Sequence, residues 1–123
     1  MDIAQVLQEC NAAALAARSL NTARTYQGAL KIFQEFLADA GLTPASPAET
    51  LQMDHFIKFP AFLAGLGYSK RSIGVYIGGA KFLLDWLVIN GLLKPDYSET
   101  LRYEMAVQQF MKKRESRLPR TPE

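Results

Sequence analysis

Two short stretches of the chain bring together side chains that bind phosphate groups. Each stretch opens a predicted helix, and neither of the windows 18–31 and 70–81 contains an acidic residue. The candidates are Ser19, Asn21, Thr22, Arg24 and Lys31 in the first stretch, and Ser69, Lys70, Arg71, Ser72 and Lys81 in the second. Free backbone N–H groups at a helix start, together with hydroxyls and cations, bind anions. The sequence therefore predicts contact with nucleic-acid phosphates, and ordinary helix capping stays the alternative for the hydroxyls.

Side chains suited to catalysis are scarce. His55 is the only histidine and Cys10 the only cysteine. A histidine pair for a metal is therefore absent from the sequence, and nothing predicts a nucleophile beside His55. Cys10 lies on an apolar helical stripe, where a free cysteine packs as a small hydrophobe. The chain as given is predicted not to be an enzyme and to use no cofactor and no metal.

The formal net charge of +2 is unevenly distributed along the chain. Residues 112–123 contain five basic and two acidic side chains, which gives +3 and leaves −1 for residues 1–111. The body of the protein is thus not broadly basic. Any anion binding has to come from the two local clusters, whose basic side chains are expected to point in one common direction.

Four glycines fall inside predicted helices. They are Gly28, Gly74, Gly78 and Gly79. Each costs the helix about 1 kcal/mol relative to alanine, a cost that is tolerated where another group must approach the backbone closely. Gly79 faces away from the basic strip, which favours helix packing. For Gly28 and Gly74, a sugar-phosphate backbone and a second helix are both open interpretations.

The hydrophobic periodicity predicts one domain of five helices without strands. The helices cover about residues 2–17, 22–40, 54–66, 69–90 and 96–114. No internal repeat is evident. The fourth helix is apolar nearly all round and is therefore predicted to lie at the centre of the bundle, while Lys81 and Asp85 near its middle argue against a membrane span. Pro60 is expected to kink or split the third helix.

Two ordered sets of residues resemble the core-binding domain of tyrosine recombinases, the phage integrase family. The first set is Ser19-x-Asn21-Thr22-x-x-x-Tyr26-x-x-x-Leu30-x-x-Phe33-x-x-Phe36-Leu37. The second set is Gly67-x-Ser69-x-x-Ser72-Ile73-x-x-x-Ile77-x-x-x-Lys81-x-x-x-x-Trp86-Leu87, followed by Gly91-Leu92-Leu93. A final Leu118-Pro119-Arg120 resembles the link to a catalytic domain, so the resemblance covers about residues 10–120.

The resemblance implies an all-α fold, a small orthogonal bundle of four to five helices of the SAM-like, core-binding type. It implies a DNA-binding domain over residues 1–115 and a linker over residues 116–123. The implied partners are double-stranded DNA at a recombination site, a C-terminal catalytic domain of the same parent chain and other recombinase protomers on the DNA, with no membrane. In the family, the second and fourth helices meet the DNA, which carries that role to the ten residues of the two stretches above.

The catalytic residues of that family lie in the C-terminal domain, so none is assigned here. The resemblance also implies DNA integration or recombination in a cytoplasmic, nucleoid-associated setting of bacterial or phage type. Two other classes of protein fit part of the pattern. One is a helical protein-interaction module in which a glycine-lined groove beside Gly74 and Gly78 receives a partner helix. The other is a helix-turn-helix regulator, which would need a short recognition helix after a tight turn.

Overall fold

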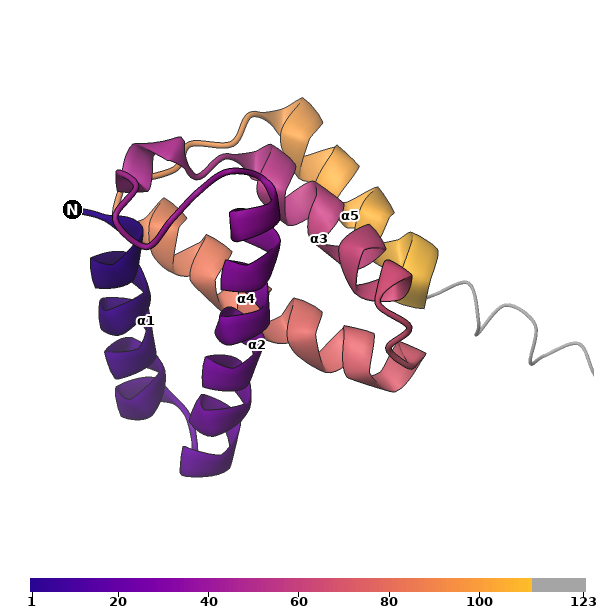
Figure 1. The fold of residues 1–123 in the computed structure, drawn as a ribbon, viewed down its shortest axis with the longest axis horizontal. Coiled ribbons are helices and arrows are strands. Elements are labelled where there is room, and N and C mark those ends of the chain that lie inside the picture. Colours follow the sequence, from indigo (N-terminus) through magenta and orange to yellow (C-terminus); the bar gives the residue numbers. More distant parts are fainter. Residues whose placement is uncertain (112–123) are drawn as a thin grey trace, which may run out of the picture.

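The computed structural model describes residues 1–111, which form an all-α bundle (Figure 1). The elements are α1 (Ile3–Ala17), α2 (Leu20–Asp39), the 3-10 turn η1 (Ala48–Thr50), α3 (Met53–Gly65), α4 (Lys70–Ile89) and α5 (Tyr97–Met111). Within these residues no strand forms, and the only bridge pairs Asp2 with Pro47. The predicted fold class is confirmed. The predictions for residues 112–123, which are the last turn of the fifth helix, the boundary at residue 115 and the linker, lie outside the described residues.

The helices begin where side chains satisfy their free backbone N–H groups. Asp2 and Gln5 form a reciprocal capping box at the start of α1, with N–H···O distances of 2.8 and 2.9 Å. Asp96 and Glu99 form the predicted box before α5. At the other end of α2 and α4, the chain turns through a glycine with positive φ, +90° at Gly41 and +73° at Gly91, a backbone conformation that favours glycine.

The chain contains an internal repeat that the sequence analysis missed. The helices α1 and α3 begin at residues 3 and 53, and α2 and α4 run over residues 20–39 and 70–89, so every boundary of the α2/α4 pair is shifted by the same fifty positions. Along that shift, identical residues stand at Ser19/Ser69, Tyr26/Tyr76, Gly28/Gly78, Lys31/Lys81, Leu37/Leu87, Gly41/Gly91 and Leu42/Leu92. The expectation of no internal repeat was wrong: α1–α2 and α3–α4 are two copies of one helical hairpin.

The two hairpins meet where α2 crosses α4, the largest helix–helix contact in the bundle. A Cβ atom added to Gly79 would lie 2.5 Å from the Cβ of Ala29 and 3.3 Å from the Cα of Tyr26. The backbone of Gly79 therefore lies directly against α2, at Ala29 and Tyr26. The predicted packing role of Gly79 is confirmed, and its contact, Ala29, is its own equivalent in the repeat.

Aromatic side chains fill the core between α2 and α3. The ring of Phe33 stacks on Phe56 and meets Phe59 edge-on, each with a centroid separation of 4.9 Å, and all three are buried. Pro60 is buried within α3, which continues through it without being split. Of the predicted kink or split, the split is absent.

Helix α4 is long and apolar enough to cross a membrane by length and composition alone. The core helix of a bundle meets the same criterion, and α4 contributes more buried residues to this bundle than any other helix of the described part. They are Ile73, Ile77, Gly79, Ala80, Leu83, Leu84 and Leu87. The predicted central position of this helix is confirmed.

Cys10 is expected to resist thiol reagents in the folded protein. Its side chain is fully buried on α1, and burial raises the pKa of its thiol to about 12, so very little reactive thiolate forms at neutral pH. Titration with a disulfide reagent should give slow labelling without denaturant and complete labelling in guanidinium chloride. Rapid stoichiometric labelling of the folded chain would contradict the packing of α1.

Candidate nucleic-acid interface

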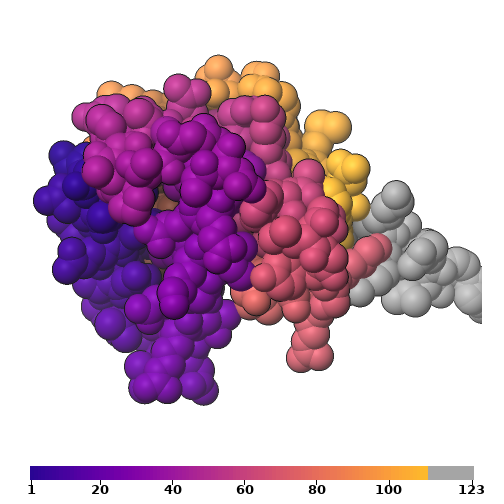
Figure 2. Space-filling view, in the orientation of Figure 1, coloured from indigo at the N-terminus to yellow at the C-terminus, as the bar shows by residue number. Residues whose placement is uncertain are grey.

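Both long helices of the repeat begin at the same edge of the molecule. In Figure 1 the starts of α2 and α4 lie along the lower edge of the view. In the space-filling view each start forms a protrusion, violet for α2 and pink for α4, and a recess separates the two (Figure 2). We call this the inter-helix recess and describe its two walls in turn.

The wall formed by the start of α2 carries four of the predicted residues. Ser19 is the N-cap, and its Oγ accepts a hydrogen bond from the backbone N–H of Thr22 at 3.2 Å. Its hydroxyl also donates to the Oγ1 of Thr22 at 3.0 Å. Asn21 and Arg24 are exposed in the first two turns. The hydroxyls thus cap the helix, as the alternative interpretation requires, and they remain on the surface beside the amide and the guanidinium.

The wall formed by the start of α4 repeats this arrangement. Ser69 is the N-cap, with its Oγ accepting from the N–H of Ser72 at 3.2 Å and its hydroxyl donating to the Oγ of Ser72 at 3.2 Å. Arg71 is exposed and Lys70 is half-buried. Two helix starts of equal geometry therefore present hydroxyls and cations at one edge.

The basic side chains of both walls are free of carboxylate partners within residues 1–111. The ion pairs of this part of the chain join Lys58 to Asp54 and Lys81 to Asp85, at 2.9 and 3.0 Å. Arg18, which the candidate set from the sequence omitted, stands directly before Ser19, and its guanidinium lies 5.5 Å from the ring centroid of Phe82. Its position next to an N-cap serine is the sequence signal that could have added Arg18 to the candidate set. Two basic residues therefore stand at each helix start, Arg18 and Arg24 at that of α2 and Lys70 and Arg71 at that of α4.

Lys31 and Lys81 do not belong to this edge. Residues follow one another at about 100° around a helix, so each lysine lies about 200° from the residue at the crossing, Ala29 or Gly79. Because Ala29 and Gly79 face each other, the two lysines point away from each other on opposite sides of the helix pair. Arg24 lies seven residues before Lys31 and Lys70 lies eleven before Lys81, so each lies within about 20° of that lysine and shares its outward face. Lys31 lines a groove between α1 and α2, whereas Lys81 lines one between α4 and α5. The expectation of one common face for both lysines was wrong.

The helix glycines separate into three kinds of site. A Cβ added to Gly28 or Gly78 would meet no atom within 4 Å, so no packing inside the domain requires glycine there. Gly79 is closed by α2, as described above. Gly74 is half-buried and lines a groove of about 410 Å³ beside α5, together with Gly78, Tyr103 and Val107. The open space at Gly28 favours close approach of an outside group.

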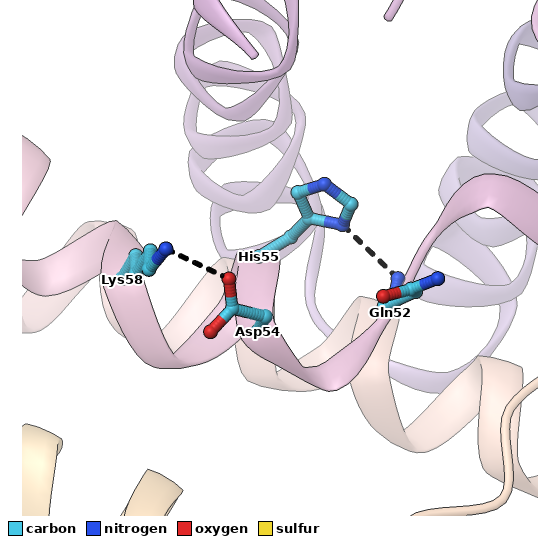
Figure 3. A network of polar contacts seen from close by, with 4 residues as sticks. All are labelled: Gln52, Asp54, His55 and Lys58. Atoms are coloured by element: carbon cyan, nitrogen blue, oxygen red, sulfur yellow. Dashed lines mark hydrogen bonds and ion pairs between the residues drawn. The ribbon is translucent and has the colours of Figure 1, made fainter.

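His55 serves as a helix cap. Its Nδ1 accepts a hydrogen bond from the backbone N–H of Gln52 at 3.0 Å at the start of α3, beside the Asp54–Lys58 ion pair (Figure 3). Its ring also lies edge-on to Phe36. Burial lowers the pKa of His55 below its ordinary value, partly offset by the negative charge of Asp54. His55 thus caps α3. Within residues 1–111 no group of three or more His, Cys, Asp or Glu side chains could hold a metal ion.

Replacement of His55 by glutamine is expected to remove part of the pH dependence of stability. Because the folded pKa is lowered, the unfolded chain binds the proton more readily, and the unfolding free energy falls as pH drops below about 6.5. A glutamine at the equivalent position of the repeat, Gln5, already makes the same cap. Urea titrations at about pH 7.5 and 5.5 should show a smaller loss for His55→Gln than for the wild type. Equal losses would contradict the capping role.

Comparison with known proteins adds no relative. No family model, no curated protein and no solved structure matches the chain. Function is therefore inferred from the residues and geometry of the inter-helix recess.

Proposed function

We propose that this chain is the DNA-binding domain of a tyrosine recombinase of the integrase type, which holds duplex DNA at a recombination site for DNA integration or recombination. The parent protein would carry its catalytic residues in a C-terminal domain. The duplex lies in the inter-helix recess, against the starts of α2 and α4. Cofactors and metals take no part in this function.

The observation that carries the proposal is the pairing of two equivalent helix starts with four basic residues that have no carboxylate partner within residues 1–111. Helix starts, hydroxyls and guanidinium groups all favour phosphate oxygens. Contacts of this kind position a protein on DNA without reading its sequence. The resemblance of the α2 and α4 sequences to the recombinase core-binding domain supports the same ligand.

Salt dependence tests this proposal. With about four phosphates neutralised, the logarithm of the binding constant should fall against the logarithm of salt concentration with a slope of about −3.6. Fluorescence anisotropy of a labelled duplex of about 20 base pairs, titrated with the 123-residue chain at several salt concentrations, measures that slope. Affinity that is absent at low salt, or present but independent of salt, would refute the proposal.

The groove between α4 and α5 supports a second candidate, a helical protein-interaction module. Gly74 and Gly78 form one wall of that groove and Val107 and Gln108 the other, which is the glycine-lined groove that this alternative requires. On α4 and α5, Ile89, Tyr97 and Met105 expose 82%, 79% and 69% of their surface. Salt-insensitive association with a protein partner would favour this candidate over DNA binding.

A further inference from the structure

We infer that copies of this chain associate head to tail, with α5 of one copy lying in the groove between α1 and α2 of the next copy. The part of α5 that enters this groove is its outer face, which is exposed in a single copy. Both surfaces belong to the domain itself, so association of this kind goes beyond the proposed function and needs no DNA.

Helix α5 shows how a helix sits on one of the two hairpins. It packs across α3 and α4, where Tyr103 is buried and Val107 is half-buried. The residues of this hairpin that line the spaces beside α5 come mainly from one side of α4. They are Met53, Gly74, Ile77, Gly78, Lys81, Leu84, Asp85, Val88 and Ile89.

The same positions of the first hairpin line a groove that no helix of residues 1–111 fills. Except for the counterparts of Gly74 and Ile89, the residues fifty positions earlier border two spaces of about 550 and 350 Å³. They are Ile3, Gln27, Gly28, Lys31, Gln34, Glu35 and Ala38. Lys31 and Gln34 border both spaces, which therefore form one continuous groove, the α1–α2 groove. Because the hairpins are copies, this groove is the counterpart of the site that holds α5.

Helix α5 has a second apolar face, which no part of residues 1–111 covers. Tyr97, Leu101 and Met105 follow one another at four-residue intervals and form one stripe along the helix. All three are exposed. The covered face has the same spacing, with Val107 four residues after Tyr103. Each face of α5 therefore presents a tyrosine and, one turn later, an aliphatic side chain, so the outer face suits a groove of the same kind.

Charge favours the same occupant of the α1–α2 groove. On the second hairpin Lys81 pairs with Asp85 at 3.0 Å, whereas its counterpart Lys31 makes no ion pair within residues 1–111. Glu104 lies about 20° around the helix from Tyr97, at the edge of the outer face. It too makes no ion pair in the described part of the chain. An outer face that enters the groove thus brings a carboxylate to a free lysine.

Two glutamines distinguish the α1–α2 groove from its counterpart. Gln27 and Gln34 stand where the second hairpin has Ile77 and Leu84, which are buried beside α5. Polar side chains form the rim of interfaces between proteins that also exist separately. The amides therefore suit a groove that is exposed to water in the free chain, and they predict a weak, reversible association.

Analytical ultracentrifugation of the 123-residue chain without DNA tests this association. A head-to-tail contact joins two different surfaces, so each added copy leaves one of each free and the assembly grows into rings or chains. The mean mass should therefore rise above that of a dimer between about 10 μM and about 1 mM, the range of weak protein interfaces. A chain that stays monomeric throughout this range overturns the proposal.

Two variants separate the surfaces. Leu101→Ser with Met105→Ser damages the outer face of α5, and Gln27→Glu with Lys31→Glu damages the α1–α2 groove. All four side chains are exposed. Each variant alone should lose at least about tenfold in its association constant. An equimolar mixture of the two should form dimers and nothing larger, because one intact face then meets one intact groove.

Val75→Ser is the matched control, because Val75 exposes 41% of its surface and Leu101 40%, and it should associate like the wild type. Circular dichroism checks that each variant is folded, and Met105→Ser alone replaces the double variant if that one is not. Full association of the groove variant would mean that the outer faces pair with each other. That result, a mixture without dimers, or an equal loss for Val75→Ser overturns the proposal.

Discussion

Replacing Gly79 with alanine should destabilise the protein, whereas the same change at Gly78 should stabilise it. At Gly79 the new methyl group would lie 2.5 Å from the Cβ of Ala29, and neither helix can move it aside by a rotamer change. Overpacking of this kind costs about 1–3 kcal/mol, which exceeds the gain of up to about 1 kcal/mol in helix propensity. At Gly78 nothing lies within 4 Å, so only the gain in propensity remains.

The two variants are matched controls for each other because they are neighbours on α4 and differ by the same atoms. Urea denaturation followed by circular dichroism should show unfolding free energies shifted in opposite directions, by about 1–2 kcal/mol downward for Gly79→Ala and about 0.5–1 kcal/mol upward for Gly78→Ala. A stabilised Gly79→Ala variant would mean that α2 and α4 do not cross at this point.

Charge reversal at the recess should abolish most DNA binding, while the same reversal elsewhere on the same helices should not. The double variant Arg18→Glu with Arg71→Glu removes one cation from beside each helix start. The variant Lys31→Glu with Lys81→Glu makes an equal change of net charge on the sides of α2 and α4 that face away from the crossing. A hydrogen bond to a charged group contributes about 1.5–3 kcal/mol, so the first variant should lose at least about a hundredfold in affinity.

The lysine variant should lose less, because Lys81 already pairs with Asp85 and Lys31 points to the side of α1. Anisotropy titrations of one duplex at one salt concentration measure both variants, and circular dichroism checks that each remains folded. Equal losses would show that binding follows net charge alone. A larger loss for the lysine variant would place the DNA on another surface of the domain.

The sequence predicted the helices well because their signals are local. Ser19, Ser69 and the Asp96–Glu99 box start helices through side chains within three residues of the cap. Glycines after α2 and α4 supply the left-handed turn that ends each helix. Apolar periodicity likewise identified α4 as the buried helix. Each of these features depends on a few neighbouring residues, so it is readable without knowledge of the tertiary contacts.

The direction of Lys31 and Lys81 was not predictable in the same way. Periodicity places each lysine on the polar side of its own helix, but only the crossing at Ala29 and Gly79 decides how the two polar sides are oriented relative to each other. The repeat escaped notice for a related reason. The first helices of the two hairpins share almost no side chains, since Cys10 stands where α3 has Pro60 and Gln5 where it has His55. The two hairpins share instead the positions of their N-caps and of the residues at the crossing of α2 and α4.

An NMR titration tests the central claim most directly, because it locates the bound duplex on the domain. Backbone amide resonances of the isotope-labelled chain are followed as a duplex of about 20 base pairs is added at low salt. DNA bound in the inter-helix recess should shift the amides of residues 18–28 and 69–78 and leave those of α1 and the far side of α5 unchanged. Shifts concentrated instead in the α4–α5 groove, at residues such as Tyr103 and Val107, or no shifts at all, would contradict the account.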